Sequence, residues 1–312
     1  MRSLLILLTY VCLQTWLGTA QVKRIVVLDK AANAFDDQYI GCAKEMDEKA
    51  PALLEEEKSK SNLLRRVWDN ATKHWQGVKK KLSFNLKDEY GIAIAYTDRC
   101  KYNNPEAFPT VFKQAMQDTI KSEADNKANF KFKAFHYYLT RALQELHWNC
   151  NQPYKQTVYR GVSDVEYRYT RSEPIRFGYF ASSSLNKKVA EEFAEKESSS
   201  IFTVLTIHTR FGVDISKLSY NRSQEEVLIP VHEEFKVSQN DDFHSTEQNC
   251  SYFHCGKKNY KCFTNSGKKN NMCPINSATR GGIAFPSGMS PSLFGGSIIL
   301  IHAAALKLTA GF

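Results

Sequence analysis

Three short segments of the chain contain the side chains that could do chemistry. They are Tyr159-Arg160-Gly161, the serine-rich run 176–188 (RFGYFASSSLNKK) and the acidic run 224–230 (QEEVLIP). An arginine fork can make two charge-assisted bonds to a phosphate, and a fixed carboxylate can stabilise a developing positive charge. Each segment alone has an ordinary explanation as a surface cation, a serine-rich turn or a solvated pair of glutamates. Only their combination and order carry information.

The elements that hold these segments lie in the second half of the chain, where short apolar runs are bounded by turn residues. This pattern predicts a short helix over 187–196 and strands over 157–162, 175–182, 201–209, 226–230 and 234–237. The sequence contains neither a GxGxxG nor a Walker phosphate loop, so a bound dinucleotide would not be held in the Rossmann manner.

The first half of the chain has apolar residues at helical spacing among glutamates and lysines. One or two amphipathic helices are predicted over 51–82, and further helices over 109–121 and 130–147. Helices first and strands later indicate an α+β chain rather than an alternating βαβ chain.

Taken together and in this order, the three segments resemble the Arg-Ser-Glu signature of the vertebrate ecto-ADP-ribosyltransferases. In that family an Arg strand, an aromatic-x-Ser-x-Ser strand and a Glu-x-Glu strand line one NAD cleft. Two more segments are similar: 35–39 (FDDQY) with Cys42, and 136–143 (HYYLTRAL). The resemblance extends from about residue 26 to 251. It implies a helix-rich N-terminal half packed on a mainly antiparallel β-sandwich with an NAD cleft.

The resemblance also implies site residues, with NAD+ as the substrate, no permanently bound cofactor and no metal; NADP+ is left open as a substrate. Glu226 would be the catalytic glutamate, which bonds a ribose hydroxyl and stabilises the oxocarbenium ion formed as nicotinamide leaves. Arg160 would hold the pyrophosphate. Ser182 would brace Glu226 and contact the nicotinamide ribose.

For residues around this signature, the resemblance implies roles that are less specific. Phe193 matches an aromatic that packs on nicotinamide in the family, although core packing of its helix explains it equally well. Arg222 is expected to contribute to NAD binding, and with Tyr220 it lies where the family has its substrate-recognition loop. A glycan on Asn221 in the same loop could obstruct a protein acceptor.

Gln224 departs from the arginine-modifying members of the family, which have Glu at this position to orient the acceptor guanidinium. A neutral amide can hydrogen-bond a guanidinium but cannot pair its charge or help to deprotonate it. Some T-cell members have the same Gln and resemble NAD glycohydrolases. The expected activity is therefore NAD+ cleavage with transfer of ADP-ribose to protein arginine or to water, and a predominant NAD+ glycohydrolase is the alternative.

Seven of the eight cysteines lie beyond the first 20 residues, and they are expected to form disulfides rather than to bind metal. No CxxC pair is present, which argues against a zinc ribbon. By resemblance Cys42 pairs with Cys250, and Cys100 with Cys150. One of Cys255, Cys262 and Cys273 is then left free or pairs between chains.

Both ends of the chain predict export to the cell surface. Residues 1–20 have the pattern of a signal peptide, and sequons at Asn70, Asn221 and Asn249 predict glycosylation. The apolar run 293–312 follows a Gly/Ser/Pro-rich spacer and predicts a GPI signal, with plain secretion as the alternative. The expected domains are the signal peptide, a catalytic domain over 21–250 (helical over 21–150, β-rich over 151–250), a stalk over 251–276 and a propeptide over 277–312.

The formal net charge of +9 favours an acidic partner but does not identify one, because lysine clusters are commonly solvated. The expected partners are NAD+ and arginine-bearing extracellular proteins, with a lipid anchor to the membrane and no nucleic acid. Two alternatives remain: a catalytically silent surface protein with the same fold, and a toxin-like or RNA-targeting protein, which the lack of interleaved aromatic and basic residues disfavours.

Overall fold

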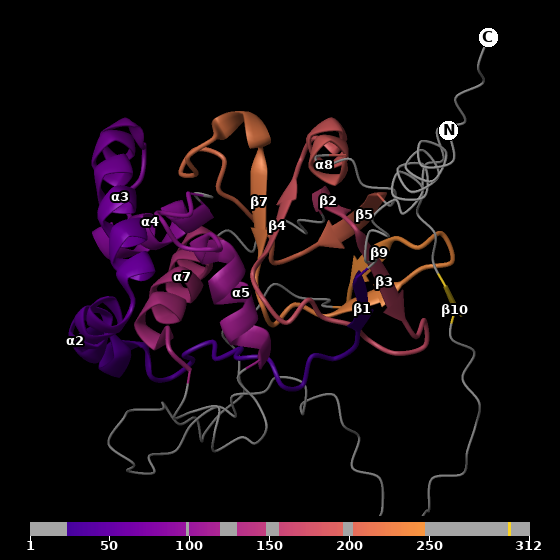
Figure 1. Ribbon diagram of the computed structural model, residues 1–312, viewed down its shortest axis with the longest axis horizontal. Helices are drawn as coiled ribbons and strands as arrows, with labels where there is room; N and C mark the ends of the chain where they lie inside the picture. Colours follow the sequence, from indigo (N-terminus) through magenta and orange to yellow (C-terminus); the bar gives the residue numbers. More distant parts are fainter. Residues whose placement is uncertain are drawn as a thin grey trace, which may run out of the picture.

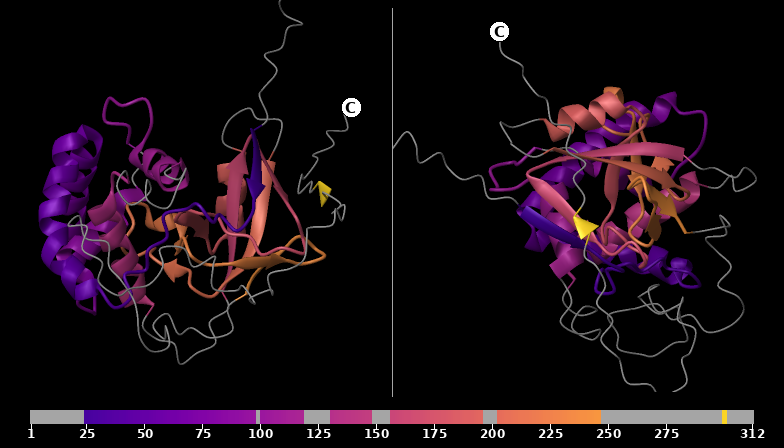
Figure 2. Two further views of the ribbon diagram at one scale, coloured as in Figure 1. Left: turned by 90° about the horizontal axis from the view of Figure 1, so that it is seen from below. Right: turned by 90° about the vertical axis from the view of Figure 1, so that its right-hand side faces the viewer.

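The computed structural model describes residues 24–97, 100–118, 130–147, 156–195, 202–246 and 299–300. In this part of the chain, the helices of the first half gather on one side and the strands on the other (Figure 1). Figure 2 shows the same division from below, with the helical layer beside the sheets. The predicted signal peptide and stalk lie outside the described residues, as does the predicted propeptide apart from Ile299–Leu300.

The helical layer consists of α2 (Ala43–Lys60), α3 (Asn62–Val78), α4 (Asp88–Ile94), α5 (Phe108–Asp118) and α7 (Lys133–Leu146). Two helices fill the region predicted to hold one or two, and α2 begins before its predicted start, with Pro51 inside it. Ser61, in an extended conformation, separates α2 from α3. Its hydroxyl accepts the amide of Leu64 at 3.1 Å, which satisfies a free donor at the start of α3.

Helix α7 lies at the centre of this layer and packs on α2 and α4. Its first amides point at Glu57 of α2, whose carboxylate accepts from the backbone of Ala134 at 2.8 Å and of Phe135 at 3.3 Å. Burial raises the pKa of Glu57 to about 7, although these amides oppose the shift. Stacked and edge-on aromatic rings, including Phe108, Phe112 and Phe135, join α5 to α7.

The strands form two sheets. The larger has the order β6-β7-β4-β2-β5-β9-β8, and the smaller the order β1-β3-β10. Neighbouring strands are antiparallel except for the pairs β1–β3 and β5–β9. The predicted α+β class, with helices on a mainly antiparallel sheet, is therefore confirmed. The strands are β1 (Arg24–Leu28), β2 (Gln156–Ser163), β3 (Val165–Tyr169), β4 (Ala181–Ser184), β5 (Phe202–Thr209), β6 (Val213–Asp214), β7 (Glu226–Ile229), β8 (Phe235–Val237), β9 (Phe243–Ser245) and β10 (Ile299–Leu300).

The strand predicted over 175–182 is wrong in its first part. Only Ile175 makes a bridge, to Phe235, and the regular strand β4 begins at Ala181. Between them Gly178 has a φ of +71°, a left-handed conformation that suits glycine. The guanidinium of Arg176 is buried and donates to the carbonyls of Lys30 and Ala31 and to the carboxylate of Asp36, so this segment is tied to the chain after β1.

Candidate active site

The three central strands of the larger sheet bring the signature segments together. Strand β4 lies between β2 and β7, and Ser184 of β4 pairs with both Tyr159 of β2 and Glu226 of β7. Opposed residues on adjacent strands point to the same face of a sheet. A cavity of about 80 Å³ opens beside these strands, lined by Thr97, Pro109, Tyr159, Arg160, Gly161, Ser182, Ser183, Ser184, Ala190, Phe193, Gln224 and Glu226.

Five of the six predicted catalytic and NAD-binding residues thus line one cavity, although they span more than sixty positions of the chain. They are Arg160, Ser182, Phe193, Gln224 and Glu226. Arg222 does not line it. Its side chain is exposed, and Nη2 lies 3.5 Å from the carbonyl oxygen of Lys217.

Arg160 is held by its neighbours with part of its donor capacity unused. Nη1 donates to the carbonyl of Ser182 and Nη2 to the hydroxyl of Tyr179 at 3.4 Å, whereas Nε is buried without a hydrogen-bond partner among the described residues. Burial alone would lower the pKa of Arg160, but Tyr179 and Tyr167 beside it raise the pKa above its ordinary value. The guanidinium is therefore a permanent cation at the cavity wall.

Glu226 is the acidic residue of the cavity, and only 4% of it is exposed to solvent. The turn before it is fixed by the end of β4. Glu225 has a left-handed φ of +44°, and its backbone carbonyl accepts from Leu185 at 3.0 Å. Ser184 donates its hydroxyl to the carbonyl of Gln224 at 2.7 Å. Burial, and then the negative charge of Glu226, raise the pKa of Tyr96, which places that carboxylate near the helical layer.

Ser184 rather than Ser182 is the serine directly opposite Glu226, because Ser182 pairs with Leu228. Ser182 contacts the site through its backbone carbonyl, which accepts from Arg160. The middle serine, Ser183, donates to the carbonyl of Val227 at 2.8 Å. The three hydroxyls therefore have different surroundings, a distinction that a run of identical residues does not reveal.

The loop before Glu226 is anchored to the helical layer. The ring of Tyr220 stacks on His74 of α3, with centroids 4.2 Å apart, and Nε2 of His74 lies 2.9 Å from the carbonyl oxygen of Leu218. Asn221 caps the short 3-10 helix Arg222–Gln224 by accepting the amide of Ser223 at 3.1 Å. This loop brings Gln224 to the cavity.

Helix α8 (Lys187–Ala194) brings Phe193 to the cavity because Gly161 lets the helix approach β2. A Cβ at Gly161 would lie 1.6 Å from the carbonyl oxygen of Ala190, where no atom fits. A glycine inside a strand is the usual sign of such a close approach. Gly161 belongs to the signature segment 159–161, but its role in packing is not apparent from the sequence.

Residues of the helical layer also lie at or near the cavity, and the sequence does not predict them as site residues. Thr97 and Pro109 line the cavity, and Lys113 lies one turn after Pro109 on α5. No pattern in the sequence relates Thr97, Pro109 or Lys113 to the three signature segments. Only Tyr179 could have been noticed, because it lies within the serine-rich run.

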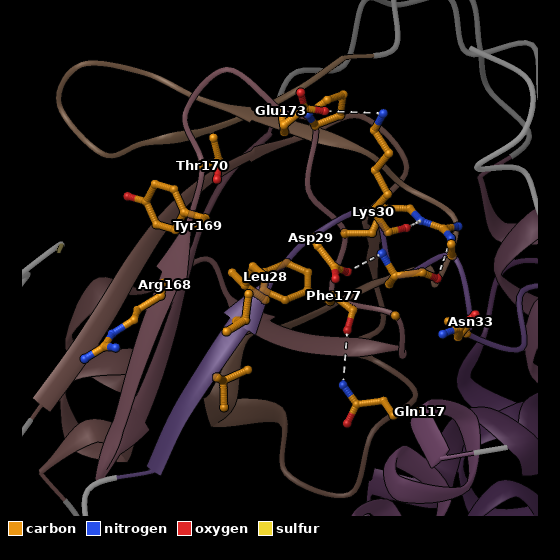
Figure 3. Close-up of a pocket in the computed structure, with 18 residues that line it drawn as sticks. Leu28, Asp29, Lys30, Asn33, Gln117, Arg168, Tyr169, Thr170, Glu173 and Phe177 are labelled. Atoms are coloured by element: carbon orange, nitrogen blue, oxygen red, sulfur yellow. Dashed lines mark hydrogen bonds and ion pairs between the residues drawn. The ribbon is translucent and has the colours of Figure 1, made fainter. Parts of the chain in front are cut away.

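A larger cavity, of about 670 Å³, is separate, and none of the predicted site residues line it. Its lining comes from β1, the chain after it and the segment after β3, and an ion pair of 3.4 Å between Lys30 and Glu173 spans its rim (Figure 3). Gln117 of α5 also reaches it, and Nε2 of Gln117 lies 3.5 Å from the carbonyl oxygen of Phe177.

The predicted disulfide cysteines and glycosylation sites lie outside the candidate cavity or outside the described residues. Cys42 is disulfide-bonded, whereas Cys150 and Cys250 lie outside the described residues, and Cys100 is exposed. Asn70 lies within α3, where its amide donates to the hydroxyl of Tyr102 at 2.7 Å, and Asn249 is outside the described residues. Within the described ranges, no helix has the length and apolar character needed to span a membrane.

Comparison with known proteins gives concordant matches. The family model for NAD:arginine ADP-ribosyltransferase matches residues 28–253. The T-cell ecto-ADP-ribosyltransferase 1 of Rattus norvegicus is 39% identical over 231 residues, which are 71% of this chain and 76% of the relative. The ecto-ADP-ribosyltransferase 5 of Homo sapiens is 35% identical, over 84% of this chain and 92% of the relative.

A similar solved structure is the crystal structure of the eukaryotic mono-ADP-ribosyltransferase ART2.2. It has a TM-score of 0.60 and 35% identity, and the match covers 74% of this chain and all of that one. A mutant of the same protein has been crystallised in complex with NAD, and it matches this chain with a TM-score of 0.60.

Proposed function

Because the chain belongs to the NAD:arginine ADP-ribosyltransferase family, we propose that it cleaves the bond between nicotinamide and ribose in NAD+ and transfers the ADP-ribose. The observation that carries this proposal is the presence of Arg160, Ser182 and Glu226 in one cavity. The cavity is smaller than the roughly 300–1,000 Å³ typical of a pocket that encloses a whole ligand. It would therefore hold only the reacting end of the dinucleotide.

The proposed chemistry follows from the charges in the cavity. As nicotinamide leaves with the bonding electrons, positive charge develops on the ribose, and Glu226 is the anion that would stabilise it. Low exposure strengthens this effect, because little water screens the carboxylate. The Arg160 cation would hold the phosphates, and Phe193 supplies an apolar surface for the nicotinamide ring.

The acceptor in this proposal is protein arginine or water. Gln224 lines the cavity and offers an amide. The arginine-modifying members of the family that the sequence resembles have a carboxylate at this position. An amide leaves an acceptor guanidinium without a charge partner. This specific feature favours a second candidate function, an NAD+ glycohydrolase that passes most of the ADP-ribose to water.

The test is incubation of the purified chain with labelled NAD+, with and without an arginine analogue, and measurement of free ADP-ribose and of the adduct. Consumption of NAD+ is expected, and the ratio of products decides between the two acceptors. Glu226→Gln preserves the size of the side chain and removes its charge, so it should lower both activities by about 100-fold or more. Substantial NAD+ consumption by this variant would show that the catalytic residue is elsewhere.

The proposed location is the cell surface, because the relatives are named ecto-enzymes and the ends of the sequence predict export. Treatment of expressing cells with a phosphatidylinositol-specific phospholipase should release the protein if its tail is replaced by a GPI anchor. Retention on the cells would contradict the anchor, and appearance in the medium without the enzyme would indicate plain secretion.

A further inference from the structure

Two cations contact one buried phenol at the edge of the candidate active site. Tyr179 is only 3% exposed, and the guanidinium carbon of Arg160 lies 5.6 Å from its ring centroid. Nζ of Lys113 lies 4.2 Å from the same centroid. Within the part of the chain that the structure describes, no carboxylate is among the groups that shift the pKa of Lys113 or of Arg160.

This arrangement is unfavourable unless something else supplies negative charge. Burial lowers the pKa of Lys113, and the positive charge of Arg160 lowers it further, while Tyr179 acts in the opposite direction. Partly buried charges are normally paired, because removing them from water costs free energy that a partner must offset. An anionic ligand that bridges the two side chains would be such a partner.

The position of Lys113 identifies which part of a ligand would reach it. Pro109, Lys113 and Gln117 are spaced four residues apart on α5 and so lie along one face of the helix. Pro109 lines the cavity of Glu226, and Gln117 lines the separate large cavity. Lys113 therefore lies on α5 between a residue that lines the small cavity and a residue that lines the large one.

We propose that Lys113 and Arg160 together hold the pyrophosphate of NAD+, with Tyr179 packed against both cations. This inference rests on the proposed function, because it assumes that the reacting end of NAD+ occupies the small cavity. A pyrophosphate has one negative charge on each phosphate, so one cation can serve each group. The arginine supplies a fixed fork of donors, and the lysine supplies a mobile point charge.

The experiment measures the dissociation constant of ADP-ribose, which keeps the pyrophosphate and lacks nicotinamide, by titration calorimetry on the full chain. Lys113→Gln should weaken binding about 10- to 100-fold, the value of one hydrogen bond to a charged group. Lys113→Arg should restore most of the affinity, because it returns the charge. Lys188→Gln, on the exposed face of α8, is the matched control and should bind like the wild type.

A structural role for Lys113 would give a different result. Without ligand the melting temperature of Lys113→Gln should equal or exceed that of the wild type, because the substitution removes a cation that Arg160 repels. A lower melting temperature with unchanged affinity for ADP-ribose would overturn the proposal. So would a loss of affinity for NADP+ that far exceeds the loss for NAD+, since Lys113 would then bind the 2′-phosphate.

The proposal and the proposed function fail in distinguishable ways. If the wild type consumes NAD+ and Lys113→Gln binds ADP-ribose as tightly, the lysine assignment is wrong and the function stands. If the wild type binds ADP-ribose but does not consume NAD+, the enzyme function is wrong. The affinities of the variants still decide whether Lys113 contacts the pyrophosphate.

Discussion

Gln224 is fixed at the cavity by its backbone rather than by its amide group. Its carbonyl accepts the hydroxyl of Ser184 at 2.7 Å, and the capped 3-10 helix before it limits its motion. A change of side chain at this position should therefore alter the charge at the cavity without moving the chain. In the proposed function, the choice of acceptor would then depend on this single residue.

Gln224→Glu is expected to raise transfer of ADP-ribose to an arginine analogue about tenfold, because a charged hydrogen bond exceeds a neutral one by about 1.4 kcal/mol. NAD+ consumption should stay within about twofold of the wild type. The measurement is the ratio of adduct to free ADP-ribose. Lys217→Gln is the control, since it changes the net charge by the same amount at an exposed residue of the same loop that does not line the cavity; an equal gain there would point to a general effect of charge.

Tyr179 predicts a pH dependence of ligand binding. Burial raises its pKa, but the positive charges of Arg160 and Lys113 outweigh burial and lower the pKa to about 8, with a further contribution from Tyr167. Below pH 8 the phenol is neutral, and both cations are available to an anionic ligand. Above pH 8 the phenolate would neutralise them, so affinity should fall as pH rises.

The expected decrease in affinity for ADP-ribose is about tenfold from pH 7 to pH 9, because only the neutral fraction of Tyr179 binds. Calorimetry at both pH values measures it. Tyr179→Phe keeps the ring and removes the ionisable hydroxyl, so its affinity should vary little over this range. A decrease of the same size in this variant would assign the titration to another group.

At the scale of elements, Gly161 determines how closely α8 approaches the sheet. The carbonyl oxygen of Ala190 lies where a side chain at this position would begin. Gly161→Ala should therefore displace α8 and Phe193, lower the stability by about 1–3 kcal/mol, and raise the KM for NAD+. Thermal unfolding and initial rates measure the two effects.

Gly77→Ala is the matched control, because a Cβ there meets nothing within 4 Å and the residue lies inside α3. In a helix this change should stabilise by about 0.5–1 kcal/mol and leave the KM unaltered. If both variants behaved alike, the close approach of α8 would not explain the presence of Gly161.

The elements that sequence analysis predicted are those with a local signal. The apolar spacing of α3 and α7 and the apolar runs of β2 and β5 are visible in the sequence itself, and so was the order of helices before strands. Strand β6 has two residues and β9 has three, too few for a periodic pattern to appear. The pairing of β1 with β3 joins Arg24 to Val165, a contact that no local pattern contains.

The residues of the candidate site likewise differ in whether the sequence contains a signal for them. The sequence predicts Arg160, Ser182, Gln224 and Glu226 as site residues because they belong to a recognisable order of motifs. The role proposed for Lys113 has no such signal, because a single lysine on an amphipathic helix is normally solvated, and its contact with Tyr179 exists only after α5 has packed beside the sheet.

At the scale of the whole molecule, Cys42 has a position suited to linking the two halves. It precedes α2, is only 7% exposed, and is disulfide-bonded. The proposed partner is Cys250, shortly after the last strand of the larger sheet, with Cys100 and Cys150 as a second pair. A bond from Cys42 to Cys250 would close almost the entire catalytic region into one loop.

Cys42→Ser should therefore lower the stability by about 2–5 kcal/mol, because a crosslink over a long loop mainly restricts the unfolded chain. Thermal unfolding measures the loss, and peptide mapping without reduction identifies the partner. Cys42 does not line the candidate cavity, so the folded variant should bind ADP-ribose with nearly the affinity of the wild type. A peptide that joins Cys42 to any cysteine other than Cys250 would contradict the proposed connection between the helical layer and the end of the sheet.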